Sequence, residues 1–262
     1  MASRKHLRAQ ALSPQADELR VAFVHTYTSD LLDPWLSMAA AVQGCRAELY
    51  HAPYGLALQE AHPQSALVQH QPHLTVLLLQ REDLHPDLAR PVTGLGAEGL
   101  QRLQAESLQR VQDIVQRFRA QKVGHLVLSF LPRLTGPTLG LLDAQAEASE
   151  AAWWAGFKQA CAQWLRQSVP SSLYLDMDEL LAQVGRAQFF DRRFWYSARF
   201  PFASAAAHEL SRRIVAVGVC LLRPKAKVLV LDADNTLWGG VVGEDGPDGI
   251  KLGPDYPGNV FM

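Results

Sequence analysis

Two aspartates near the end of the sequence, Asp232 and Asp234, are separated by one residue and follow the apolar run KVLVL at 227–231. Such a run predicts a buried strand, so both carboxylates are expected at its carboxyl end, where open α/β sheets place their ligands. One carboxylate can act as a nucleophile while the other protonates a leaving oxygen. Both are hard oxygen ligands suited to Mg²⁺, which would offset the repulsion between Asp232 and a phosphate.

The alternative interpretation of these residues is a turn in which Asp and Asn side chains bond to the nearby backbone. An isolated D-x-D pattern favours the turn. The strand expected before it, the Asn-Thr-Leu at 235–237, and the two glycines Gly239 and Gly240 favour a catalytic loop.

The segment KVLVLDADNTLWGGVVGEDGPDGIKLGPDYPG, residues 227–258, closely resembles the first motif of the FkbH-like branch of the haloacid dehalogenase superfamily. The pattern there is an apolar strand, then LDxDNTLWGG, GEDG and IKLG. The resemblance implies that Asp232 is the phosphoryl-accepting nucleophile and Asp234 the acid/base. It also implies Mg²⁺ on Asp232 and the backbone carbonyl of Asp234, and phosphate binding at Asn235 and Thr236.

FkbH-like proteins take a glyceryl unit from a phosphorylated three-carbon acyl donor, remove phosphate, and leave glyceryl on the phosphopantetheine thiol of an acyl carrier protein in polyketide biosynthesis. The resemblance therefore implies a glyceryl transferase and phosphatase with Mg²⁺ as its cofactor. Later motifs of the superfamily, which supply further groups for the phosphoryl oxygens and Mg²⁺, would lie beyond Met262. Because such preorganised charge is normally the largest catalytic contribution, this chain alone is expected to be inactive.

Apolar strand patterns alternate with helical patterns through residues 17–222, which is typical of a doubly wound α/β domain. Strands are expected at 19–25, 47–51, 73–79, 123–130 and 172–176, and helices at 34–43, 98–120, 143–167 and 203–222. We therefore predict a three-layer α/β domain with a mostly parallel five-stranded sheet, and the FkbH-like resemblance implies that it is of the SGNH-hydrolase or flavodoxin kind. A flexible terminus at 1–16 precedes it, and from 227 the first strand and loop of an incomplete Rossmann-like domain of haloacid dehalogenase type follow. The strand at 228–231 is expected to pair with an edge of the first domain or of a neighbouring chain, since an isolated strand leaves its backbone groups unpaired.

The upstream region also resembles the FkbH-like family, whose N-terminal region is an SGNH-hydrolase-like α/β domain. The resemblance is carried by VAFVHTYTSDLLDPWL at 21–36, APYG at 52–55 and FDRRFWYSARFPF at 190–202.

Active SGNH hydrolases need a serine on the loop after the first strand and a late DxxH motif whose histidine activates it. In this sequence the candidates on the first loop are Thr26, Thr28 and Ser29. Asp191 is followed three residues later by Phe194 instead of histidine. A nucleophile without its base is weak, so a working esterase site is not expected.

Seven of the fourteen residues from 189 to 202 are aromatic. The favoured interpretation is a non-helical segment that seals the core at the open end of the sheet. The alternative is a binding surface in which Trp195 and Tyr196, with nearby arginines, contact an acidic carrier protein or its phosphopantetheine arm.

The composition excludes several classes of function. With 25 basic and 26 acidic side chains, the chain has no excess of positive charge for nucleic acid. The longest uncharged apolar run, residues 214–222, is far shorter than the roughly 20 residues that cross a bilayer. The terminus lacks the apolar segment of a secretory signal, so we expect a cytoplasmic protein.

Two rival functions stay open. The α/β domain could be a non-catalytic module that binds a carrier protein, or an SGNH-type esterase or acyltransferase that uses the loop from Thr26 to Ser29.

Overall fold

The computed structural model describes residues 16–55, 59–223, 227–254 and 260. The chain divides after Arg223 into two compact units, which are described separately. The flexible terminus expected at 1–16 lies, except for Ala16, outside the described residues.

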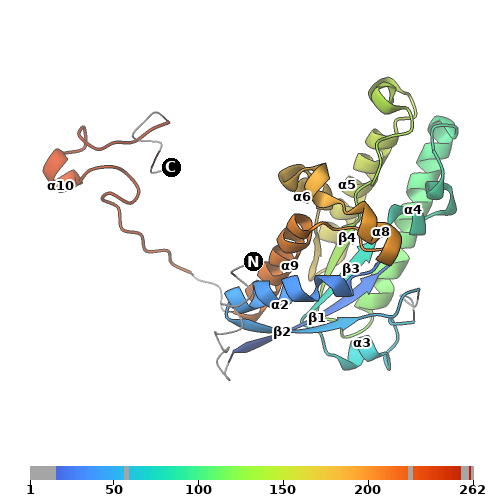
Figure 1. Ribbon diagram of the computed structural model, residues 1–262, viewed down its shortest axis with the longest axis horizontal. Coiled ribbons are helices and arrows are strands. Elements are labelled where there is room, and N and C mark those ends of the chain that lie inside the picture. The colour runs from blue at the N-terminus through green and yellow to red at the C-terminus, as the bar shows by residue number, and fades with distance from the viewer. Residues whose placement is uncertain (1–15, 56–58, 224–226, 255–259, 261–262) are drawn as a thin grey trace. The chain divides into compact units, whose positions relative to one another are not determined.

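The first unit is built on a five-stranded parallel sheet (Figure 1), as predicted. Its strand order is β2-β1-β3-β4-β5. The strands are β1 (Asp17–His25), β2 (Cys45–His51), β3 (Leu74–Leu79), β4 (His125–Phe130) and β5 (Ser172–Tyr174). All five predicted strands are present, and each carboxyl end lies at the same edge of the sheet because every pairing is parallel.

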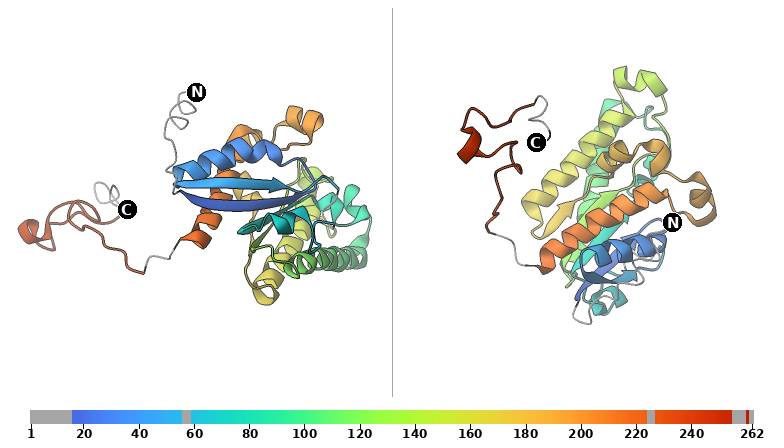
Figure 2. Two further views of the ribbon diagram at one scale, coloured as in Figure 1. Left: turned by 90° about the horizontal axis from the view of Figure 1, so that it is seen from below. Right: turned by 60° about the vertical axis from the view of Figure 1, so that its left-hand side comes forward.

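Helices cover both faces of this sheet, which makes three layers; Figure 2 shows α2 and α4 on opposite sides of β1 and β2. The α-helices are α2 (Asp33–Val42), α3 (Ala66–Gln69), α4 (Gly96–Arg119), α5 (Glu150–Ser168), α6 (Met177–Val184), α7 (Arg186–Phe189), α8 (Arg192–Ala198) and α9 (Ser204–Leu222). Short 3₁₀ helices are η1 (Asp30–Leu32), η2 (Arg81–Asp83), η3 (Pro86–Ala89) and η4 (Gly140–Gln145).

The alternation of side chains along β1 explains the two layers of helices. Leu19, Val21 and Phe23 belong to the core beneath α2 and α9, whereas Ala22 and Val24 belong to the core beneath α4 and α5. Successive residues of a strand point to opposite faces, so a strand that is apolar at every position is buried on both.

Helix α9 lies very close to β1. A Cβ atom on Gly218 would lie 2.6 Å from Leu19 Cδ1, a separation that real side chains do not tolerate. Gly218 therefore allows the close packing of α9 on the sheet.

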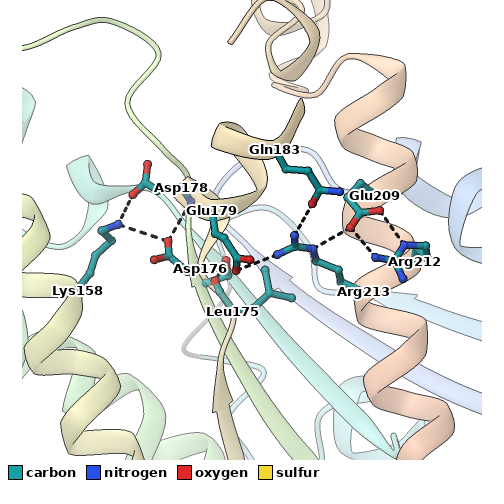
Figure 3. Close-up of polar contacts among 10 residues, drawn as sticks. Lys158, Leu175, Asp176, Asp178, Glu179, Gln183, Glu209, Arg212 and Arg213 are labelled. Carbon is teal, nitrogen blue, oxygen red and sulfur yellow. Dashed lines mark hydrogen bonds and ion pairs between the residues drawn. The ribbon is translucent and has the colours of Figure 1, made fainter. Parts of the chain in front are cut away.

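A cluster of charged side chains links α5, α6 and α9 near the end of β5 (Figure 3). Its members are Lys158, Asp176, Asp178, Glu179, Gln183, Glu209, Arg212 and Arg213. Arg213 contacts Glu209 at 3.0 Å on its own helix and Glu179 at 3.3 Å on α6. The acids of the cluster are thus paired with cations, and they hold the helices together.

Two helical predictions differ from the structure. The helix expected from residue 143 begins at Glu150, because Asp143 accepts hydrogen bonds from the backbone N–H groups of Glu150 (2.9 Å) and Ala151 (3.1 Å) and from the hydroxyl of Ser149 (2.8 Å). Asp143 therefore caps the helix from outside it. The aromatic segment 189–202 is not devoid of helix, because it contains α8 and the end of α7.

In the second unit the strand expected at 227–231 is not formed. Val228, Leu229 and Val230 are 77–87% exposed, and no described residue pairs with their backbone. Pairing of this segment with an edge of the first domain or of a neighbouring chain stays a prediction. A strand needs a neighbouring strand for its backbone hydrogen bonds, and apolar residues alone do not provide one. The unit does contain the short helix α10 (Val242–Asp245) and a pair of hydrogen bonds between Gly239 and Lys251 at 3.1 and 2.7 Å.

Candidate functional site

The D-x-D loop of the second unit is closed by contacts among its own residues. One carboxylate oxygen of Asp234, Oδ1, accepts hydrogen bonds from Trp238 Nε1 at 3.0 Å and from the backbone N–H of Val242 at 3.2 Å. Asn235 adopts a left-handed backbone conformation, with φ of 53°, and its side-chain oxygen accepts from the N–H of Gly240 at 3.0 Å. These bonds fix the orientation of Asp234 and turn the chain back toward the two glycines.

Asp232 lies outside this network of hydrogen bonds. Its side chain is exposed, and no described residue donates a hydrogen bond to its carboxylate. Thr236 is also exposed, and its backbone N–H donates to the carbonyl of Ala233 at 3.2 Å. The structure therefore brings Asp234 and Asn235 together around the glycines and leaves the Asp232 carboxylate free to contact a ligand.

The oxygen donors of this loop suit Mg²⁺ in their chemistry. Mg²⁺ usually binds one or two protein carboxylates and completes its shell with water and substrate phosphate. Within the described ranges no group of three or more Asp, Glu, His or Cys side chains could enclose a metal ion. Asp232 and the backbone carbonyl of Asp234 are oxygen donors of the kind that Mg²⁺ prefers.

A second arrangement of polar residues lies in the first unit, at the carboxyl ends of β1 and β2. Ser29 Oγ lies 2.6 Å from His51 Nδ1, and His51 Nε2 lies 2.8 Å from Asp33 Oδ1. Ser29 was among the candidates from the sequence, but His51 and Asp33 were not. His51 ends β2 and lies 22 residues from Ser29, so its contact with the β1 loop arises from the parallel pairing of the two strands.

This Ser29–His51–Asp33 chain has the residue types of a hydrolase triad without the access that catalysis needs. Ser29 is fully buried. Both ring nitrogens of His51 are engaged, and its ring stacks on Phe23 with centroids 4.8 Å apart. A nucleophile must reach its substrate, which the full burial of Ser29 prevents, so these contacts serve to position the loop after β1.

The two threonines of that loop are also held by backbone contacts. Thr26 Oγ1 accepts a hydrogen bond from the N–H of Gln80 at 2.9 Å, which links the ends of β1 and β3. The hydroxyl of Thr28 donates to the carbonyl of Ala198 in α8. Both side chains thus attach the loop to neighbouring elements.

The remaining candidates of the first unit do not form a group with Ser29. Asp191 caps α8, because its Oδ1 accepts from the backbone N–H groups two and three residues later, at 2.9 and 3.2 Å. Trp195 packs under the guanidinium of Arg199, whose carbon lies 5.3 Å from the ring centroid. Tyr196 is 80% exposed. Of the aromatic segment, Phe189, Phe200 and Phe202 are buried in the core beneath α9, as the sealing interpretation expects.

Comparison with known proteins finds structures with a similar fold but shows no family to which the chain belongs. No protein-family model matches the sequence, and no curated protein matches it. One similar solved structure is the N-terminal part of the protein BF1531 from Bacteroides fragilis. That structure contains a phosphatase domain and is complexed with Mg. It matches this chain with a TM-score of 0.72 at 21% sequence identity. The match covers 98% of this chain and 66% of that one, so this chain spans about two thirds of that structure. At this identity the similarity shows a shared fold.

Two further similar structures are more distant. They are the lipase Lip_vut3 from a goat rumen metagenome (TM-score 0.49, 13% identity, covering 76% of this chain and 97% of that one) and the salicylyl-acyltransferase SsfX3 from a tetracycline biosynthetic pathway (TM-score 0.38, 16% identity, covering 80% and 56%). No helix among the described residues is both long enough and apolar enough to cross a membrane.

Proposed function

We propose that this chain is part of an FkbH-like enzyme of haloacid dehalogenase type, a glyceryl transferase and phosphatase. It would dephosphorylate a phosphorylated three-carbon acyl donor and load glyceryl onto the phosphopantetheine of an acyl carrier protein in polyketide biosynthesis. The observation that carries the proposal is the D-x-D loop, in which Asp234 is held by two N–H donors while the Asp232 carboxylate stays free. The phosphatase domain and Mg of the BF1531 structure are consistent with it.

In this proposal the phosphoryl step uses the two aspartates in different roles. The Asp232 carboxylate attacks phosphorus, the bond from phosphorus to the leaving oxygen breaks, and Asp234 delivers a proton to that oxygen. Water then cleaves the aspartyl-phosphate and releases inorganic phosphate. Asp232 and the Asp234 carbonyl would hold Mg²⁺, which supplies positive charge against the phosphoryl oxygens.

The test is intact-mass spectrometry of a holo acyl carrier protein incubated with the phosphorylated three-carbon donor and Mg²⁺. The reaction is run with this chain and with a chain extended through the rest of the phosphatase domain. We expect a gain of one glyceryl mass with the extended chain only. Asp232→Asn in the extended chain should abolish the gain, whereas Asp248→Asn, an exposed acid of the same unit outside the loop, should not. A carrier left unmodified by the extended chain, or a gain that persists in Asp232→Asn, would contradict the proposal.

The rival functions give different results in the same samples. A carrier-binding module would form a complex with the holo carrier protein through the first unit. The carrier protein would then gain no glyceryl mass with either chain. An esterase would hydrolyse an activated ester, and Ser29→Ala would remove that activity. Because Ser29 is fully buried and so cannot reach a substrate, we expect no ester hydrolysis by this chain.

A further inference from the structure

A hollow of about 370 Å³ lies in the first unit at the carboxyl ends of β1 and β3. In the strand order β2-β1-β3-β4-β5, the chain passes from β1 to β2 on one side and from β3 to β4 on the other, so the direction of the connections reverses between β1 and β3. This is the switch point at which open parallel sheets bind ligands. Ligand pockets of proteins measure roughly 300–1,000 Å³, so the hollow has room for a small molecule.

His25, the last residue of β1, is part of the wall of this hollow. Its side chain is buried, with only 6% of the residue exposed, and neither ring nitrogen has a hydrogen-bond partner among the described residues. It is the one residue of the described chain in which two buried side-chain nitrogens both lack partners. A buried polar group without a partner costs free energy, so such a group calls for an explanation.

Several other polar side chains around the strand ends do have partners. His51 bonds to Ser29 and Asp33, Thr26 accepts from Gln80, and the Ser129 hydroxyl of β4 donates to the carbonyl of Leu175 at 2.7 Å. The hydroxyls of Tyr27 and Tyr174 near this edge also lack partners among the described residues, but neither residue lines the hollow. Of the described residues that line the hollow, His25 alone has buried side-chain polar atoms without a partner.

The imidazole of His25 is suited to both donate and accept a hydrogen bond. Burial, and next the nearby His51, lower the pKa of His25, while backbone groups of Tyr27 and Ala52 oppose this shift. A neutral imidazole carries one N–H donor and one acceptor nitrogen.

The remaining walls indicate the chemistry of a ligand. Leu79, Leu84 and Ile114 provide an apolar surface. Arg110 of α4 also lines the hollow, and its guanidinium is exposed and makes no ion pair with any described residue. Asp83, whose pKa is raised chiefly by burial, is a hydrogen-bond acceptor in the same wall. A short carbon chain with a hydroxyl or carbonyl group and an anionic end matches this distribution, because guanidinium binds carboxylate and phosphate alike.

We propose that this hollow is a binding site for a small organic anion, in which His25 hydrogen-bonds the polar group of the ligand and Arg110 binds its carboxylate or phosphate. The site is formed by the first unit alone and does not depend on the phosphoryl chemistry proposed for Asp232.

The proposal is tested by isothermal titration calorimetry of the full chain with two probes, 3-hydroxybutyrate and butyl phosphate, which carry the two kinds of anionic end. We expect saturable binding of at least one probe. His25→Phe, which keeps a ring but removes both nitrogens, and Arg110→Gln should each weaken that binding at least tenfold. Arg102→Gln is the matched control, because Arg102 is also exposed on α4 but does not line the hollow; it should change the dissociation constant less than twofold.

Proton NMR of the histidine rings tests whether the probe binds next to His25. Addition of the probe should shift the ring resonance that is missing from the spectrum of His25→Phe. If His25→Phe does not fold, as judged by circular dichroism, the comparison of Arg110→Gln with Arg102→Gln decides the matter. The proposal is overturned if neither probe binds the native chain, if His25→Phe binds as tightly, or if the two arginine variants lose affinity equally.

Discussion

At the scale of single residues, the first unit contains two tyrosines whose hydroxyl groups are in opposite situations. Tyr27 is fully buried, packs edge-on against Phe202, and its hydroxyl has no hydrogen-bond partner among the described residues. Tyr50 is partly buried, and its hydroxyl donates to Glu60 Oε1 at 2.9 Å. Burial raises the pKa of both hydroxyls, that of Tyr50 to about 12. Both hydroxyls therefore stay protonated, and of the two only that of Tyr50 donates a hydrogen bond to a described residue.

Removal of the two hydroxyls should change stability in opposite directions. Tyr27→Phe deletes a buried group that lacks a partner, so we expect the free energy of unfolding to rise by about 1 kcal/mol. Tyr50→Phe deletes a hydrogen bond and should lower it by about 1 kcal/mol. Urea denaturation of the two variants and the native chain measures both changes. A loss of stability in Tyr27→Phe would mean that its hydroxyl has a partner in solution.

At the scale of elements, α9 is held to its surroundings by both packing and charge. Its apolar residues Leu210, Ile214 and Val215 are buried against the sheet. Glu209, which is also buried, receives hydrogen bonds from two arginines of the same helix (Figure 3). The hydrogen bond from Arg212, followed by that from Arg213, lowers the pKa of Glu209 to about 2 against the opposing effect of burial.

The lowered pKa of Glu209 predicts a stability that depends on pH. A carboxyl whose pKa is lower in the folded chain stabilises it above the unfolded pKa of about 4.5, and this contribution is lost as the pH falls toward about 2. This contribution is roughly 3 kcal/mol at most, because a shift of one pKa unit corresponds to about 1.36 kcal/mol. Urea denaturation between pH 6 and pH 2.5 should therefore show that the free energy of unfolding falls less in Glu209→Gln than in the native chain.

The matched control for this prediction is Glu147→Gln, because Glu147 is exposed and forms no ion pair with a described residue. It should follow the native pH profile. If Glu209→Gln declined as steeply as the native chain, the stabilising role of this carboxylate in the folded state would be disproved.

At the scale of the whole molecule, nearly all of the buried apolar surface belongs to the first unit. Two clusters of apolar side chains, one on each face of the sheet, make up its core. In the second unit the residues Val228, Leu229 and Val230 are exposed. Apolar side chains stabilise a fold only when they are removed from water, so this segment contributes little to stability.

Because both apolar clusters consist of residues of the first unit alone, removal of the second unit should leave the stability of the first unchanged. We expect a chain that ends at Arg223 to unfold at the same temperature as the full chain, within about 2 °C. Amide protons of residues 228–231 should exchange without protection in the full chain. Thermal circular dichroism and hydrogen-exchange mass spectrometry check the two statements. A fall of more than about 5 °C, or protection at 228–231, would show that the second unit contributes to the folded core.

The sequence by itself determined the five strands of the first unit and its four longer helices, α2, α4, α5 and α9, but not the short helices α3, α6, α7 and α8. Period-two and continuous apolar runs specify buried strands, and steps of three and four residues specify helix faces, because both patterns are local. The loop from Asp234 to Gly240 is likewise closed by near neighbours in the chain, so its residues suffice to indicate it.

Only the tertiary structure decided which distant residues meet. The contact of His51 with Ser29 and the hollow beside His25 depend on strands that pair in parallel, and no spacing in the sequence encodes that pairing. The run at 227–231 shows the converse: its residues favour a strand, but no neighbouring strand pairs with the described segment. Strand formation is a property of the paired backbone, whereas the side-chain pattern is a property of one segment.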